Sequence, residues 1–197
     1  MDEPFLSIVT RCFKRPKMLF RCIESVSKQT DNDYEHVLCV DNIGIAAIPG
    51  EWQKQGDHLF RHARRIHGKY IYMLDDDDFL IDNDFVKGLK EVCQDDPDVI
   101  FVKMSRPFYG VGQILPNERC WGIQPVQDLI GTPCFVVKRE TWMNFIPNFR
   151  GDGADFQFIE SIFRTNPKVY WWDRVVTQVG QAGQKRPEGS DGRNKGV

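Results

Sequence analysis

The stretch GKYIYMLDDDDF, residues 68–79, joins a short apolar run to four consecutive aspartates. Tyr70–Leu74 is apolar throughout, and a short apolar run bounded by polar residues is typical of a strand that is buried on both faces. The acidic run Asp75–Asp78 begins where this predicted strand ends. Because ligands in open α/β sheets bind outside the carboxyl ends of the strands, we expect the functional site at these aspartates.

The rest of the chain alternates between strand and helix patterns around this stretch. Strand-like apolar runs occupy residues 5–10, 34–40, 99–102, 134–137 and 169–179. Apolar residues recur at helical spacing over residues 16–26, 85–93, 139–145 and 156–163. Residues 105–131 are rich in glycine and proline and are expected to be loops. The alternation in the first half of the chain predicts an α/β fold with a parallel sheet covered by helices.

Length and composition restrict the class of protein. The 197 residues fit one domain, placed at residues 1–180, and the Gly- and Lys-rich residues 181–197 are expected to form a mobile tail. The net charge of −2 lacks the basic excess of a general nucleic-acid binder. No apolar run approaches the roughly 20 residues that span a bilayer, and the N-terminus is acidic, so we expect a cytoplasmic protein without a transmembrane segment. The six cysteines form no CxxC pair and are expected to be buried free thiols.

Four adjacent carboxylates need some form of charge compensation. Two carboxylates about 6 Å apart repel each other by about 3 kcal/mol at an effective dielectric constant near 20. The acidic run is therefore expected to be splayed into water, partly protonated or bridged by a cation. Hard carboxylate oxygens suit magnesium, manganese or calcium and do not suit zinc. The alternative is a solvated acidic turn in which Asp78 or Asp82 caps the next helix.

Other acidic residues and one tryptophan are also candidates. Asp41 follows the predicted strand at residues 34–40, where it could cap a turn or accept hydrogen bonds from a base or ribose. Asp152 and Asp155 precede the helix at residues 156–163, and one of them is expected to be its N-cap while the other acts as a general base. Trp121 lies in the loop-rich segment and could stack on a sugar, whereas the other tryptophans are expected in the core.

Basic residues stand near the same predicted strand ends. Arg11, Lys14 and Arg15 precede a helix N-terminus, where unpaired N–H groups and the helix dipole favour an anion. Arg64 belongs to a second basic cluster. Each of these residues alone would be an ordinary surface residue. Together with the aspartates they predict a cleft with charges of both signs, which suits a metal-bound diphosphate.

Five motifs together resemble the family 2 glycosyltransferases of the GT-A fold. In chain order they are LSIVTRCFKRPKMLFRCIESVSKQT (residues 6–30), YEHVLCVDN (34–42), GKYIYMLDDDDF (68–79), GTPCFVVKRETW (131–142) and GDGADFQFIESIF (151–163). The similarity covers about residues 5–178. It implies a minimal catalytic domain of the nucleotide-diphospho-sugar transferase type, with a Rossmann-like, mostly parallel sheet flanked by helices.

The resemblance also implies roles for the residues at matching positions. The donor nucleotide and its diphosphate would be bound by Thr10, Arg11, Asp41, Arg64, Asp75 and Asp76. A divalent cation, Mn²⁺ or Mg²⁺, would be held mainly by Asp77, with Asp75 in its ligand shell. The sugar and the acceptor would meet Asp78, Trp121 and Thr132.

The segment GDGADF departs from the Glu-Asp motif in which the family carries its catalytic base. With Asp155-Phe156 aligned to the motif, Asp152 takes the glutamate position and Gly153 takes the aspartate position. Asp152 or Asp155 must then act as the base, or the activity is weak or absent.

The resulting hypothesis is transfer of a sugar from a nucleoside-diphosphate donor, a UDP-sugar, to a hydroxyl of a glycan or another acceptor, with inversion. One alternative is an inactive nucleotide-sugar or carbohydrate-binding module, with which Gly153 is compatible. A less favoured alternative is a sugar-phosphate nucleotidyltransferase, because the segment TRCFKRP lacks the glycines of such an enzyme's phosphate-binding loop.

Overall fold

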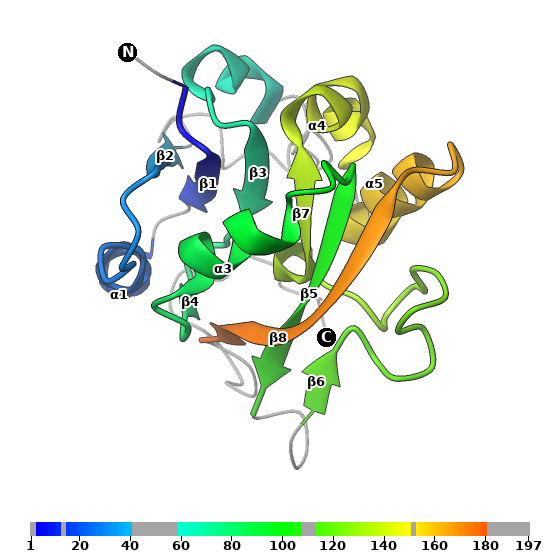
Figure 1. Cartoon of the computed structure of the whole chain (residues 1–197). Coiled ribbons are helices and arrows are strands. Elements are labelled where there is room, and N and C mark those ends of the chain that lie inside the picture. Colours follow the sequence, from blue (N-terminus) through cyan, green and yellow to red (C-terminus); the bar gives the residue numbers. More distant parts are fainter. Residues whose placement is uncertain (1–2, 13–14, 41–58, 108–112, 151–152, 181–197) are drawn as a thin grey trace, which may run out of the picture.

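Eight strands form one sheet in the computed structural model, which describes residues 3–12, 15–40, 59–107, 113–150 and 153–180 (Figure 1). The strands are β1 (Leu6–Cys12), β2 (Tyr34–Val40), β3 (Tyr70–Met73), β4 (Asp78–Leu80), β5 (Val99–Arg106), β6 (Gln113–Leu115), β7 (Phe135–Lys138) and β8 (Val169–Val179). The α-helices are α1 (Pro16–Val26), α3 (Phe85–Val92), α4 (Arg139–Phe145) and α5 (Ala154–Phe163). Three short 3₁₀ turns are η2 (Ala63–Arg65), η3 (Thr132–Cys134) and η4 (Ile146–Asn148).

The sheet is mixed, so the prediction of a mostly parallel sheet is wrong. Its order is β2-β1-β3-β7-β5-β8-β4, and β6 pairs with β5 outside this path. Among the described strands, β1 pairs in parallel with β2 and β3, and β5 with β8, whereas the four remaining pairs are antiparallel. Strand β7 lies between β3 and β5 and is antiparallel to both. A short buried run has the same apolar pattern in either direction, so the pattern did not predict this reversal.

Two hydrophobic cores lie on opposite faces of the sheet. Successive residues of a strand point to opposite faces, and accordingly Ile71 belongs to one core while Tyr70 and Tyr72 belong to the other. The Ile71 core is covered by α4 and α5, and the Tyr72 core is covered by α1 and α3. Strands β1 and β3 are buried almost throughout because both faces are covered.

The predicted helices are confirmed, with corrections at one cap and two strands. Helix α1 begins at Pro16, and proline suits the first helical position because its missing N–H would have no partner there. The N-cap of α5 is Gly153, in the left-handed conformation (φ 68°), so the prediction of an aspartate N-cap is wrong. Strand β6 interrupts the segment predicted as loop, and Asp78 begins strand β4.

Two further sequence predictions concern the membrane and the cysteines. In the part of the chain that the structure describes, no helix combines the length and hydropathy needed to cross a bilayer. All six cysteines are buried and carry free thiols, as predicted. Residues 181–197, predicted to be a tail, lie outside the described residues.

Candidate functional site

The acidic run forms a turn between the end of β3 and the start of β4. The N–H of Asp78 donates a hydrogen bond to the carbonyl oxygen of Asp75 over 3.0 Å. Asp76 and Asp78 are buried, whereas the side chains of Asp75 and Asp77 are 24% and 19% exposed. The turn therefore separates the four carboxylates into a buried pair and a partly exposed pair.

Two arginines from the end of β1 and the start of α1 compensate this charge. The Arg11 guanidinium pairs with Asp75 over 3.0 Å. The Arg15 guanidinium bridges two carboxylates, with Nη2 on Asp76 and Nη1 at 2.7 Å from Asp77 Oδ2. Guanidinium stays protonated at any physiological pH, so this compensation is permanent. Water, protons or a metal ion were predicted in this role, whereas ion pairs with these two arginines were not.

The pKa values of two aspartates in the run are raised. Burial, with a smaller contribution from the neighbouring Asp75 carboxylate, raises the pKa of Asp77 to about 6, although Arg15 opposes the shift. Burial also raises the pKa of Asp78 well above its usual range. Asp78 Oδ1 accepts a hydrogen bond from the N–H of Gly180 over 3.3 Å. Ion pairs with the two arginines thus compensate the acidic run, and the raised pKa values of Asp77 and Asp78 favour the neutral form of these two carboxyl groups.

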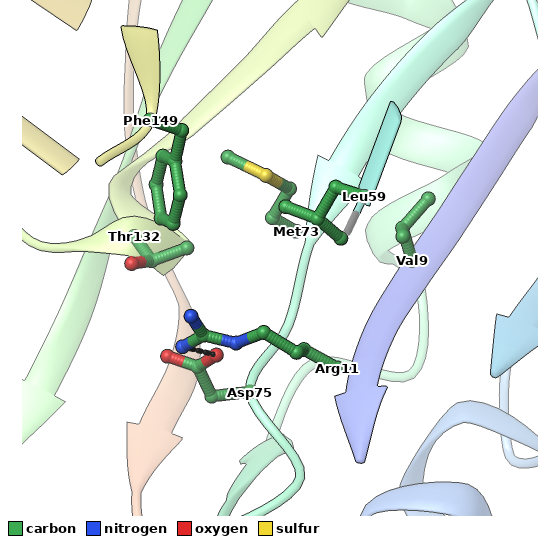
Figure 2. Close-up of a pocket in the computed structure, with 7 residues that line it drawn as sticks. All are labelled: Val9, Arg11, Leu59, Met73, Asp75, Thr132 and Phe149. Carbon is green, nitrogen blue, oxygen red and sulfur yellow. Dashed lines mark hydrogen bonds and ion pairs between the residues drawn. The ribbon is translucent and has the colours of Figure 1, made fainter. Parts of the chain in front are cut away.

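A pocket lies beside Asp75, between the ends of β1 and β3 (Figure 2). Its lining residues are Val9, Arg11, Leu59, Met73, Asp75, Thr132 and Phe149. Figure 2 shows the Arg11 guanidinium against Asp75, with Thr132 and Phe149 on the neighbouring wall. The guanidinium carbon of Arg11 lies 5.9 Å from the centre of the Phe149 ring. The pocket thus combines apolar walls with one paired charge of each sign.

Asp155 lies on the first turn of α5, and its pKa is affected by the acidic run. Burial raises its pKa, and the Asp75 carboxylate adds to the shift. Asp155 Oδ1 also accepts a hydrogen bond from the N–H of Phe156 over 2.8 Å. A carboxylate with a raised pKa is suited to accept a proton near neutral pH.

Thr10 and Arg64 lie apart from the pocket walls. Thr10 is fully buried, between two residues that line the pocket, and its hydroxyl is 2.8 Å from Nε2 of His36. Burial lowers the pKa of His36 to about 4, so its ring is neutral. Arg64 is exposed on η2.

Trp121 packs on the protein itself. Its ring makes an edge-to-face contact with Trp171, with centroids 5.1 Å apart, and Lys103 Nζ lies 4.5 Å from its ring centre. It is not among the described residues that line the pocket, whereas Thr132 is. Asp41 and Asp152, the other two predicted site residues, lie outside the described residues.

The described residues offer a partial donor set for a divalent cation. No three of their His, Cys, Asp and Glu side chains gather as a ready-made metal centre. The partly exposed carboxylates of Asp75 and Asp77 have the hard oxygens that Mn²⁺ and Mg²⁺ prefer. Mg²⁺ is commonly held by one or two carboxylates together with substrate phosphates, and this donor set fits that mode of binding.

Several site residues carried little signal in the sequence. Phe149 lies in a loop-like segment, and nothing in its neighbours marks it as part of the pocket wall. Gly180 follows β8, and an added Cβ there would lie 1.9 Å from the carbonyl oxygen of Asp77. Arg15 was recognisable as a basic residue before a helix, but its two carboxylate partners depend on how β1 and β3 pair.

Neither a family model nor a curated protein matches this sequence. Solved structures match in fold. S. aureus TarS 1–349 matches with a TM-score of 0.66 and 12% identity, over 89% of this chain and 60% of that chain. Mannosyltransferase PcManGT from Pyrobaculum calidifontis, in complex with GDP-Man and Mn²⁺, matches with a TM-score of 0.63 and 13% identity. The match covers 95% of this chain and 59% of the mannosyltransferase chain. A197 from STIV matches with a TM-score of 0.52 and 17% identity, and the match covers 85% of this chain and 81% of the A197 chain.

The first of these proteins has also been solved with a nucleotide sugar. TarS 1–349 in complex with UDP-GlcNAc matches with a TM-score of 0.64 and 11% identity, over 88% of this chain and 57% of that chain. The chain thus spans about three fifths of TarS 1–349 and of the mannosyltransferase. These likenesses show that the chain has a mixed α/β fold that is also found in glycosyltransferases.

Proposed function

We propose that the chain is a glycosyltransferase of the family 2 type, which transfers a sugar from a nucleoside-diphosphate donor to a hydroxyl acceptor. A UDP-sugar is the donor that we favour. The observation that carries the proposal is the charged group at the carboxyl ends of β1 and β3, where Arg11 and Arg15 face Asp75 and Asp77 beside a pocket. The fold shared with nucleotide-sugar glycosyltransferases supports the same reading.

In this proposal the donor binds across the pocket. Arg11 and the acidic run meet the ribose and the diphosphate, while Thr10, buried on the opposite face of β1, supports the strand through His36. Asp41 and Arg64 are proposed to approach the base. Asp77, with Asp75, would hold a Mn²⁺ or Mg²⁺ ion together with oxygens of the diphosphate. When bound, that ion would supply positive charge to the departing diphosphate.

The chemical step needs a base on the acceptor side. The acceptor oxygen attacks the anomeric carbon as the bond from that carbon to the diphosphate oxygen breaks, and its proton passes to a carboxylate. We assign this role to Asp155, whose raised pKa suits it, with Asp152 as the other candidate. Asp78, Trp121 and Thr132 are proposed to contact the sugar or the acceptor. A single displacement of this kind inverts the configuration at the anomeric carbon.

Calorimetric titration of the full chain with UDP, with and without Mn²⁺, tests the donor site. We expect binding in the presence of Mn²⁺ that weakens roughly 10- to 100-fold in Asp77→Asn, because a charge-assisted contact is lost. Asp173→Asn is the matched control, since this aspartate is 71% exposed on β8 and pairs with Lys103. If UDP does not bind to the wild type, or binds equally to both variants, the proposed donor site is wrong.

Gly153 supports a second candidate, a nucleotide-sugar-binding module without turnover. This glycine is the N-cap of α5 and lies at the position where the resemblance implies a carboxylate base. Release of UDP from UDP-sugars separates the two functions. A glycosyltransferase should release UDP, and Asp155→Asn should slow this roughly 100-fold or more while UDP affinity is kept. Binding of UDP without release from any UDP-sugar and acceptor pair would favour the binding module.

A further inference from the structure

Arg15 occupies the carboxylates on which the proposed donor site depends. One guanidinium nitrogen contacts Asp76 and another lies 2.7 Å from Oδ2 of Asp77. The Arg15 side chain is only 15% exposed, and Asp76 is almost completely buried. This arrangement is a bridge between the start of α1 and the turn after β3, and not a loose surface ion pair.

The Arg15 guanidinium has one N–H group whose hydrogen-bonding capacity is unused among the described residues. Arg15 Nε is buried and has no hydrogen-bond partner among the described residues. A buried N–H without an acceptor is costly, and a ligand oxygen could satisfy it. The planar guanidinium also suits phosphate, whose oxygens it can bind in a bidentate manner.

A divalent cation and Arg15 compete for the carboxylate of Asp77. Both carry positive charge, and the guanidinium cannot become neutral by losing a proton. A cation that binds Asp77 would therefore displace Arg15 from this carboxylate. The diphosphate of the donor offers the released guanidinium a new anionic partner.

We propose that Arg15 is an exchangeable counter-ion: it holds Asp76 and Asp77 in the donor-free protein and transfers to the donor diphosphate when a divalent cation binds Asp77. This inference rests on the proposed function. It predicts that Arg15 has opposite effects on two binding affinities. Arg15 lowers the affinity of the donor-free protein for the cation, and it raises the affinity for the nucleotide diphosphate once the cation is present.

The test measures both affinities in Arg15→Gln. Binding of Mn²⁺ to the donor-free full chain is followed by electron paramagnetic resonance of the free ion, and binding of UDP in saturating Mn²⁺ is followed by calorimetry. We expect Mn²⁺ to bind roughly tenfold more tightly and UDP roughly tenfold more weakly than in the wild type. A residue with a merely structural role would weaken both, so weaker or unchanged Mn²⁺ binding, or unchanged UDP binding, overturns the proposal.

Two further variants make the result interpretable. Arg21→Gln removes one positive charge from α1, the helix that Arg15 caps. The Arg21 guanidinium carbon lies 3.5 Å from the centre of the Phe79 ring, away from the aspartates' ion pairs, and both affinities should stay within about twofold of wild type. If Arg15→Gln does not fold, the same two affinities are measured in Arg15→Lys, because lysine keeps the positive charge but lacks the planar guanidinium. It should shift both affinities in the same two directions by a smaller factor, and shifts of equal sign overturn the proposal. A wild type that binds neither Mn²⁺ nor UDP contradicts the proposed function itself.

Discussion

Single residues decide how this chain tolerates four adjacent aspartates. Arg11 and Arg15 bring two permanent charges to a group of four carboxylates, three of which they contact directly. Burial of an ion pair has a desolvation cost that can offset its attraction, so these pairs are no simple source of stability. Removal of one partner is a different matter, because an uncompensated buried charge costs about 3–5 kcal/mol. The exposed pair of Lys28 and Glu24, by contrast, contributes little.

His36 should make the stability of the protein depend on pH. Its pKa is about 4 in the folded protein because it is buried, compared with 6.5 for an ordinary histidine. Between these values the unfolded chain binds more protons than the folded one, so stability is complete above about pH 6.5 and is lost as the pH falls toward 4. From about pH 7.5 to about pH 5, we expect the wild type to lose at most about 2 kcal/mol more unfolding free energy than His36→Gln.

Urea unfolding of both proteins at the two pH values measures this difference. Only the difference is informative, because the raised pKa values of Asp77 and Asp78 act in the opposite direction and are shared by the two proteins. Equal losses in the two proteins would show that His36 titrates in the same range whether the chain is folded or unfolded.

At the scale of elements, the end of β8 holds the acidic run in place. Strand β4 pairs with β8 so that Asp78 lies opposite Val179. The next residue, Gly180, donates its N–H to the Asp78 carboxylate and lies against the backbone of Asp77. The last described strand of the chain therefore touches the turn on which the proposed site is built. A side chain at position 180 would have to move this turn.

Gly180→Ala should damage both the stability and the site. An added Cβ would lie 1.9 Å from the carbonyl oxygen of Asp77, a backbone atom that cannot move without shifting the turn. We expect a loss of about 1–3 kcal/mol in unfolding free energy, as is usual for overpacking, together with weaker UDP binding in Mn²⁺.

Gly131→Ala is the matched control for this substitution. Its added Cβ would meet Cε and Sδ of Met104 at 2.9 and 3.1 Å, at the flexible end of a side chain that can adjust. It should cost less than Gly180→Ala and leave UDP affinity unchanged. Equal costs, with UDP binding retained by both variants, would show that Gly180 does not position the acidic run.

At the scale of the molecule, one sheet joins two hydrophobic cores. Phe101 on β5 lies in the core covered by α4 and α5, where its ring stacks on Trp171 with centroids 4.1 Å apart. Leu89 on α3 lies in the core on the other face. Because β1, β3, β5 and β7 contribute buried residues to both cores, damage to either face should affect the whole domain.

Phe101→Ala and Leu89→Ala should each lower the midpoint of the same unfolding transition. Loss of the aromatic ring should cost about 3–5 kcal/mol and loss of the leucine side chain about 2–5 kcal/mol. Urea unfolding followed by far-UV circular dichroism and by tryptophan fluorescence should give coincident curves with an unchanged m-value. Separate transitions for the two probes, in either variant, would mean that the two faces unfold independently.

The local sequence was sufficient to predict most helices and strands. Apolar runs of four to seven residues marked β1, β2 and β3, and helical spacing marked α1 and α3, because burial selects apolar side chains with the period of each element. The acidic run marked the carboxyl end of β3 for the same reason, since a strand buried on both faces cannot continue through four carboxylates.

Tertiary structure decided the direction of β7, the partners of the aspartates and the contact at Gly180. Arg11 and Arg15 are more than sixty residues away from Asp75 and Asp76 in the chain, and they meet only because β1 pairs with β3. Such contacts depend on strand order and on backbone geometry, which hydrophobic periodicity does not encode. A run of residues determines what it must bury, whereas the pairing of distant segments determines which charges face each other.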